Sequence, residues 1–175
     1  MEKSASHGSH DALKMLEQDH EHVKRLFKDF EKLSAKDAGR KAELVAEVCQ
    51  QLTVHAALEE ELFYPSIKAA VKASELDEAK VEHAQQRGMV EQLQSMEPGD
   101  SLYDATVTVL GEYVNHHVKE EESEIFPQVR KGDIDIASLG KQMLERRESL
   151  MEETSNASTA SRKTHKSAPT HHARH

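Results

Sequence analysis

The sequence has no tryptophan, only 7 glycines and 4 prolines, and a single cysteine, Cys49. One cysteine excludes a disulfide within the chain, and a lone thiol is typical of a reducing compartment, so we expect a cytoplasmic protein. Scarce glycine and proline favour helices over sheets. Residues 1–15 hold no apolar segment of the kind a secretory signal needs. No run of about eighteen apolar residues occurs, so we expect no membrane-spanning helix.

Positive charge falls short of negative charge, with 23 Lys and Arg residues against 32 Asp and Glu residues, and the formal net charge is −9. An acidic body makes nucleic acid an unexpected partner. Residues 155–175 differ from the rest of the chain, because they hold four Lys or Arg residues, no acid, and many Ser, Thr and His residues. Such a segment cannot bury a core, so we predict a disordered tail there. The expected organisation is a flexible N-terminus over residues 1–9, one domain over residues 10–154, and this tail.

Apolar residues recur at spacings of three and four in four long segments, which is typical of amphipathic helices. The segments run from Leu13 to Phe30, from Leu44 past Pro65, from Ser74 to Pro98, and from Ser101 to near Gly132. Ser74 and Ser101 are predicted N-caps. A weaker fifth segment covers about residues 136–153. No segment alternates as a strand does. Short connections predict an all-α, antiparallel up-down-up-down four-helix bundle with a short additional C-terminal helix.

A histidine followed four residues later by a glutamate occurs twice on these apolar stripes. The stretch HAALEEELFYP, residues 55–65, matches HVKEEESEIFP, residues 117–127, at an offset of 62, and the pair DH at 19–20 recurs as EH at 82–83. The first and third helices therefore correspond, as do the second and fourth. Folding the two halves together would gather these inward-facing polar residues: His20, His55, Glu59, His83, His117 and Glu121.

Such residues indicate a metal site. A buried carboxylate without a partner lowers the stability of the fold by several kcal/mol, so something should compensate its charge. Residues four apart on a helix are neighbours and can reach one ion or two adjacent ions. A glutamate can also bridge two ions about 3.5–4 Å apart. Imidazole and carboxylate together suit iron, manganese or zinc.

The ordered elements DH, HAALEE, EH and HHVKEE resemble the hemerythrin-like (HHE cation-binding) family over about residues 10–130. The resemblance implies a four-helix bundle with a non-haem di-iron centre. His20 and His55 would bind one iron and His83 and His117 the other. Glu59 and Glu121 would bridge the two ions, together with an oxo, hydroxo or water bridge.

Two choices stay open around this motif. His116 and Glu120 could replace His117 and Glu121, but the latter pair keeps the spacing to Pro127 that the first copy keeps to Pro65. Glu60 and Glu122 could be extra ligands, although we expect them to face solvent. Tyr113 could donate a hydrogen bond at the site, although a partly buried role in the bundle is expected.

The third helix departs from the oxygen-carrying hemerythrins, which have a second histidine four residues after the first. Arg87 stands there instead. It could reach a bound peroxide, but we expect it to pair with a glutamate at the surface. The departure argues against reversible oxygen carriage.

The resemblance implies a protein that binds dioxygen, peroxide or nitric oxide for sensing, scavenging or storage. One alternative is a peroxidase-like, catalase-like or iron-oxidising enzyme. Another is a metal-responsive interaction module with a protein partner that the sequence does not identify.

Overall fold

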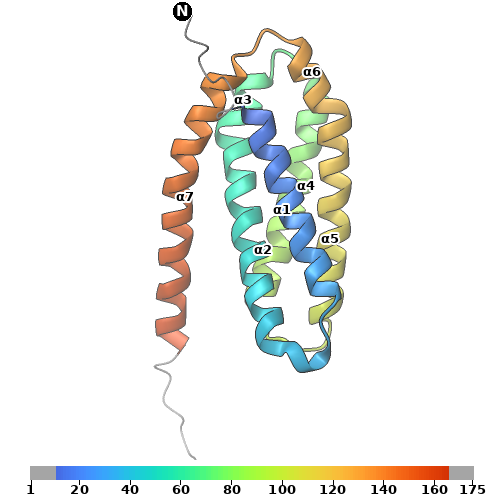
Figure 1. The fold of residues 1–175 in the computed structure, drawn as a ribbon, viewed down its shortest axis with the longest axis vertical. Coiled ribbons are helices and arrows are strands. Elements are labelled where there is room, and N and C mark those ends of the chain that lie inside the picture. Colours follow the sequence, from blue (N-terminus) through green and yellow to red (C-terminus); the bar gives the residue numbers. More distant parts are fainter. Residues whose placement is uncertain (1–10, 166–175) are drawn as a thin grey trace, which may run out of the picture.

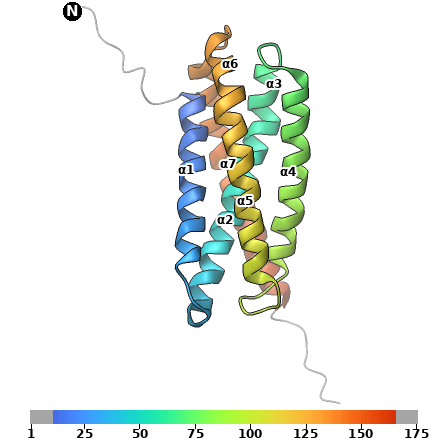
Figure 2. The ribbon, with the colours of Figure 1, turned by 90° about the vertical axis from the view of Figure 1, so that its right-hand side faces the viewer.

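The computed structural model describes residues 11–165, and the side chains of residues 11–155. Four long helices form the body: α1 (Ala12–Glu31), α2 (Ala38–Leu58), α4 (Ala73–Gln94) and α5 (Tyr103–Glu120). They run antiparallel and are joined at alternate ends of the bundle (Figures 1 and 2). No strand occurs within residues 11–165. The predicted all-α four-helix bundle is confirmed.

The helix ends are set by local capping interactions. Asp11 accepts a hydrogen bond from the Lys14 backbone N–H at 3.1 Å and so caps α1. A reciprocal capping box between Ser34 and Asp37 starts the short 3-10 turn η1 (Ala35–Asp37) ahead of α2. The predicted capping roles of Ser74 and Ser101 are wrong. The residues that precede α4 and α5 are Lys72 and Leu102, and neither makes a side-chain cap bond.

A single π-helical turn interrupts the second and fourth bundle helices at matching places. These turns are η2 (Glu59–Phe63) and η3 (Glu121–Ile125), and each begins at the glutamate of an H-x-x-x-E motif. The short helices α3 (Tyr64–Ile67) and α6 (Phe126–Lys131) follow, each with a proline in its first turn. Pro65 and Pro127 lack the N–H that an uninterrupted α-helix would use. The break expected at Pro65 is thus a wide turn just before it, and such turns often lie at functional sites.

A fifth helix, α7 (Ile136–His165), packs along α1 and α2 (Figure 1). Its buried residues Leu139, Met143 and Leu150 join the apolar cluster at that end of the bundle. It extends beyond the predicted range of residues 136–153. Residues 155–165, predicted as part of the disordered tail, continue α7 as helix. Residues 1–10 and 166–175 lie outside the described part, so the flexible N-terminus and disorder in the rest of the tail stay predictions. Among residues 11–165, no helix has both the length and the apolar character that crossing a bilayer requires.

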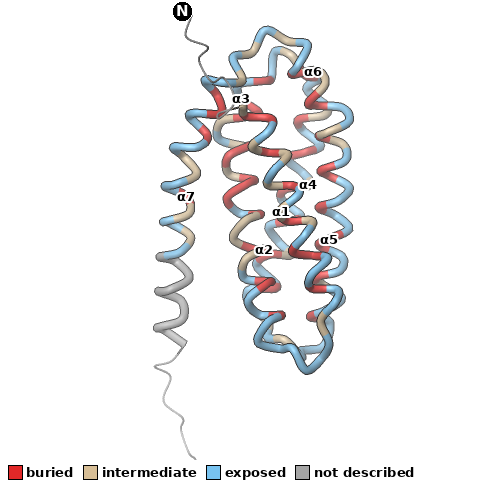
Figure 3. Tube along the Cα trace, in the orientation of Figure 1, coloured by how far each residue is buried: buried red, intermediate tan, exposed pale blue. Residues whose placement is uncertain are grey.

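The core consists of two apolar clusters separated by a polar layer. One cluster includes Leu13, Leu58 and Phe126, and the other includes Phe27, Leu52 and Val114. Buried positions recur along the facing sides of the bundle helices (Figure 3). Between the two clusters the buried positions carry histidine and glutamate instead of leucine. The fold therefore places its most polar buried groups near the middle of its own core.

The packing of α7 gives a stability prediction. Met143 is 0% exposed whereas its neighbour Leu144 is 37% exposed. We expect Met143→Ala to lower the free energy of unfolding by about 2–4 kcal/mol, because truncation leaves a cavity in the core. Leu144→Ala, the control, should change it by less than about 1 kcal/mol. Urea denaturation followed by circular dichroism measures both, and equal effects would show that α7 is not docked as described.

Candidate metal centre

The six residues predicted from the sequence converge in the polar layer. Their exposed fractions are all 8% or less. The histidines come one from each bundle helix, and the glutamates begin the two π turns. They form two groups, each able to hold a metal ion: His20, His55, Glu59 and Glu121, and then Glu59, His83 and His117. Glu59 belongs to both.

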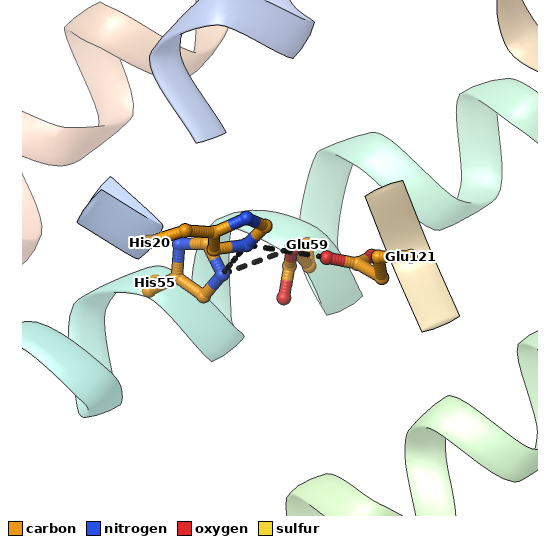
Figure 4. A group of neighbouring side chains, drawn as sticks. All are labelled: His20, His55, Glu59 and Glu121. Carbon is orange, nitrogen blue, oxygen red and sulfur yellow. Dashed lines mark hydrogen bonds and ion pairs between the residues drawn. The ribbon is translucent and has the colours of Figure 1, made fainter. Parts of the chain in front are cut away.

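The first group, drawn in Figure 4, is built around two imidazoles that face each other. The Nε2 atoms of His20 and His55 lie 3.2 Å apart. Glu59 Oε1 lies 3.1 Å from His55 Nε2, and Glu121 Oε2 lies 3.4 Å from His20 Nε2. Two nitrogens that bind one ion at about 2.1 Å and at right angles are about 3 Å apart. The spacing of the two imidazoles is therefore that of a ligand pair.

The second group repeats this arrangement from the other half of the chain. His83 Nε2 and His117 Nε2 lie 3.1 Å apart. Glu59 Oε2 lies 3.2 Å from His83 Nε2, and Glu121 Oε2 lies 3.8 Å from His117 Nε2. Glu59 thus directs one oxygen to each group, as a carboxylate that bridges two ions would.

Several buried carboxylate oxygens have no hydrogen-bond donor. Within the described residues, both oxygens of Glu59 and Oε2 of Glu121 make no hydrogen bond. Buried polar atoms are almost always satisfied, so each exception needs an explanation. A cation placed among these oxygens and the imidazole nitrogens would satisfy all of them. The donor set therefore fits a pair of metal ions.

A second layer of carboxylates fixes the orientation of every imidazole. The Nδ1 atoms of the four histidines lie 2.8–3.3 Å from four carboxylates, in the pairs His20–Glu122, His55–Asp19, His83–Glu60 and His117–Glu82. These contacts hold each Nδ1 proton outward and leave Nε2 free for a metal. These outer carboxylates follow the internal repeat of the sequence, because Asp19 corresponds to Glu82 and Glu60 to Glu122. The expectation that Glu60 and Glu122 merely face solvent is therefore wrong.

Basic groups in turn pair with these outer carboxylates. Arg147 of α7 binds Asp19 through two hydrogen bonds of 2.6 and 2.5 Å. Arg87 donates to Glu60 at 2.6 Å, and is 49% exposed. Lys24 lies 3.9 Å from Glu122. Arg87 thus lies at the surface and contacts an outer carboxylate, as expected, and does not enter the cluster.

The structure separates the adjacent His116 and His117. His117 is buried in the second group together with Glu121, whereas His116 is exposed and contacts Glu120 at 3.1 Å. The spacing to Pro127 therefore indicated the pair that enters the core. Tyr113 is also exposed, and its hydroxyl donates to Gln85. It makes no contact with the cluster.

Sequence reasoning missed Tyr64, which lies beside the cluster. Its hydroxyl donates to Glu121 Oε1 at 3.1 Å, and its ring stacks on His83 with centroids 5.7 Å apart. The repeat places Phe126 at the matching position, where it stacks on His20. Burial and the nearby charge of Glu121 raise the pKa of Tyr64 well above its usual range, so the phenol remains a donor. In the sequence, the signal that could have identified Tyr64 is its hydroxyl, which Phe126, at the same position of the second copy, lacks.

The charges inside the metal-free cluster are set by the opposed effects of burial and neighbours. Burial alone would lower the pKa of His55, but the charge of Glu59 and a hydrogen bond to Asp19 outweigh it and raise the pKa to about 10. Burial opposes ionisation of Glu59, but His55 and His83 lower its pKa well below the ordinary value. At neutral pH the metal-free chain thus holds the imidazolium of His55 against the carboxylate of Glu59.

The link from α7 to His55 through Asp19 gives a metal-binding prediction. Arg147→Ala should free Asp19 and loosen the orientation of His55, which would weaken binding of one of two ions by up to about tenfold. Arg146→Ala is the matched control, because Arg146 pairs with Glu61 and Glu153 at the surface. Titration against a chelator of known affinity measures both variants. Identical affinities in the two would contradict a role for α7 at the centre.

Metal binding should also release protons. Because the pKa of His55 lies above neutrality, the metal-free protein carries that proton at pH 7, and a metal must displace it. Glu59 is already ionised and releases none. The apparent affinity should therefore rise with pH across the neutral range. Calorimetric titrations in two buffers of different ionisation enthalpy count the protons, and a count of zero would contradict the prediction.

Comparison with known proteins identifies the family. Residues 11–129 match the hemerythrin HHE cation binding domain. A crystal structure of an HHE cation binding domain-containing protein from Mycobacterium kansasii superposes with a TM-score of 0.70 at 23% identity, over 82% of this chain and 88% of that one.

A curated protein from Nostoc sp., named a DNA nickase, is 27% identical over 116 residues, or 66% of this chain. The chain spans only 32% of that protein's length. The match to the family domain, supported by the fold, shows that this chain belongs to the hemerythrin HHE cation-binding family.

Proposed function

We propose that the protein is a non-haem di-iron protein that binds dioxygen, peroxide or nitric oxide for sensing, scavenging or storage. One observation carries the proposal. Two facing imidazole pairs share a buried glutamate, Glu59, whose two oxygens point one to each pair and lack any hydrogen-bond donor. This arrangement suits two adjacent ions better than one.

The donor set supports iron. Imidazole and carboxylate ligands suit iron, manganese and zinc, whereas softer ions prefer thiolates. Cys49 lies in the same apolar cluster as Leu52 and belongs to neither metal-binding group. Iron would supply redox chemistry toward small oxidants. The chain contributes burial that excludes bulk water, fixed imidazoles, and the Tyr64 hydroxyl as a hydrogen-bond donor beside Glu121.

The arrangement around Arg87 favours a second candidate, a peroxidase-like or catalase-like enzyme. Each group contains two imidazoles, and Arg87 is turned away toward Glu60. A centre with two imidazoles per ion leaves more coordination positions for an oxidant than one with an additional histidine. Turnover of peroxide, without a stable oxygenated state, would distinguish this enzyme from a carrier or sensor.

Two further features bear on the setting of the protein. Burial raises the pKa of the Cys49 thiol to about 11, so it stays protonated, and a lone thiol of this kind supports a cytoplasmic location. Two observations argue against extending the DNA cleavage named for the Nostoc protein to this chain. The chain spans about a third of that protein, and its net charge of −9 disfavours a phosphate backbone.

Metal analysis and optical spectra of the purified protein test the proposal. We expect close to two irons per chain and a ligand-to-metal charge-transfer band that changes when the reduced protein meets dioxygen or peroxide. A double variant, Glu59→Ala with Glu121→Ala, should lose most of the iron, because both shared carboxylates are gone. Glu61→Ala with Glu112→Ala removes two exposed glutamates and should keep it.

The negative outcomes are equally specific. Fewer than about one iron per chain and no charge-transfer band would contradict a di-iron centre. Unchanged iron in the Glu59 and Glu121 double variant would show that the metal binds elsewhere. A centre that binds iron but does not respond to any oxidant would leave the metal-responsive interaction module as the better description.

A further inference from the structure

A small acidic pocket opens between α4 and α5 beside the centre. Its volume is about 40 Å³, enough for a cation with part of its water shell. Five glutamates line its outer part: Glu75, Glu78, Glu82, Glu120 and Glu124. Its inner wall includes His117 and Glu121, which belong to the buried cluster. The pocket therefore connects the surface to the proposed metal centre.

The internal repeat supplies a comparison for this pocket. In the first half of the chain, Ala12, Met15, Leu58 and Leu62 occupy the positions of Glu75, Glu78, Glu120 and Glu124. These apolar residues belong to or pack against the cluster that α7 covers. The bundle therefore does not need acids at these positions. In one half the space is filled and covered, and in the other it is open and lined with carboxylates.

The two halves also differ in what neutralises the outer carboxylate. In the first half Asp19 receives the guanidinium of Arg147. Its counterpart Glu82 lies near His116 and Glu120, and the three offer ligand atoms that all lie within 4.8 Å of one another. Within the described residues, no lysine or arginine forms an ion pair with the carboxylates of Glu78, Glu82, Glu120 or Glu124. Among the five pocket glutamates, the structure described for residues 11–155 pairs only Glu75 with a lysine, Lys72 at 2.9 Å. Where the first half provides a protein cation for its outer carboxylate, the second therefore provides ligands for one.

The inner wall of the pocket includes a glutamate that carries an unpartnered buried oxygen. Glu121 is 1% exposed, and its Oε2 atom has no hydrogen-bond donor. Glu121 lines the pocket and also contacts His20 and His117 in the two groups of the centre. A cation that enters between the outer glutamates would next meet the side chain of Glu121, whose Oε2 atom lies toward these two histidines. The acidic cluster therefore leads to a vacant ligand atom and is not an isolated surface feature.

We propose that this pocket is the uptake route for divalent cations, with Glu82, His116 and Glu120 as a transit site at its mouth. Carboxylates would replace the water ligands of the ion in steps, which lowers the cost of bringing it into the core. The negative field of the pocket would raise the local cation concentration and the rate of capture. The inference rests on the metal centre proposed above and adds how that centre is filled.

The rate of metal uptake tests the route. Metal-free protein is mixed with Co²⁺ at low ionic strength, and uptake is followed by absorbance. Glu78→Gln with Glu124→Gln removes two charges from the pocket without changing side-chain size, and should slow uptake by about tenfold. Glu31→Gln with Glu91→Gln changes the net charge equally at exposed positions away from the pocket, and should load at nearly the unmodified rate.

Each outcome has a separate meaning. Equal rates in the two double variants would overturn the route. Failure of the unmodified protein to take up any Co²⁺ would contradict the metal centre itself, and so the proposed function. The transit site is tested in protein whose centre is already filled, by adding Mn²⁺ and measuring water-proton relaxation. One further weak ion should bind, and His116→Gln should abolish it; retention of that ion in the variant would overturn the transit site.

Discussion

The structure depends on the burial of two glutamates in the middle of a helical core. Glu59 and Glu121 are 0% and 1% exposed and lie between two apolar clusters. Each buried carboxylate costs several kcal/mol without compensation, against a typical total stability of about 5–15 kcal/mol. In the metal-free chain the imidazolium of His55 provides part of that compensation. Around the cluster, outer carboxylates contact the imidazoles, and basic side chains at the surface pair with these carboxylates. A metal pair would replace the imidazole protons and leave this outer network in place.

The local backbone is adapted to the same requirement. Both glutamates begin a π turn, and both turns end just before a proline. At the turn after Glu59, two consecutive glutamates belong to different layers of the site. Glu59 faces the centre, whereas Glu60 contacts the Nδ1 atom of His83. The same pattern holds for Glu121 and Glu122 with His20. Each half therefore supplies the outer carboxylate for a histidine of the other half, which ties the two halves together.

Much of this could be predicted from the sequence, because helical periodicity and an internal repeat are local or directly comparable signals. They gave the four helices and the six residues that the structure brings together. The outer layer was missed because Glu60 and Glu122 sit in acidic runs that are typical of a solvated surface. The link from Arg147 to Asp19 joins residues 128 positions apart, and no spacing rule predicts such a contact. The π turns were missed because the prolines indicated a break without specifying its hydrogen bonding.

The departures from the repeat are as informative as the repeat itself. A duplicated sequence that served only to build a symmetric centre would keep the same residues around both halves. Instead, α7 covers one face while glutamates line the matching face, and Tyr64 replaces the phenylalanine of the other copy. Both the phenol and the acidic pocket contact Glu121, and neither contacts Glu59. The two glutamates therefore have different surroundings: Glu59 offers one oxygen to each imidazole pair, whereas Glu121 accepts a hydrogen bond from Tyr64 and also lines the pocket. Exchange of ions and of small ligands is expected at the His83–His117 group, because His117 lines the pocket, whereas the His20–His55 group, which Asp19 links to α7, would hold an ion more firmly.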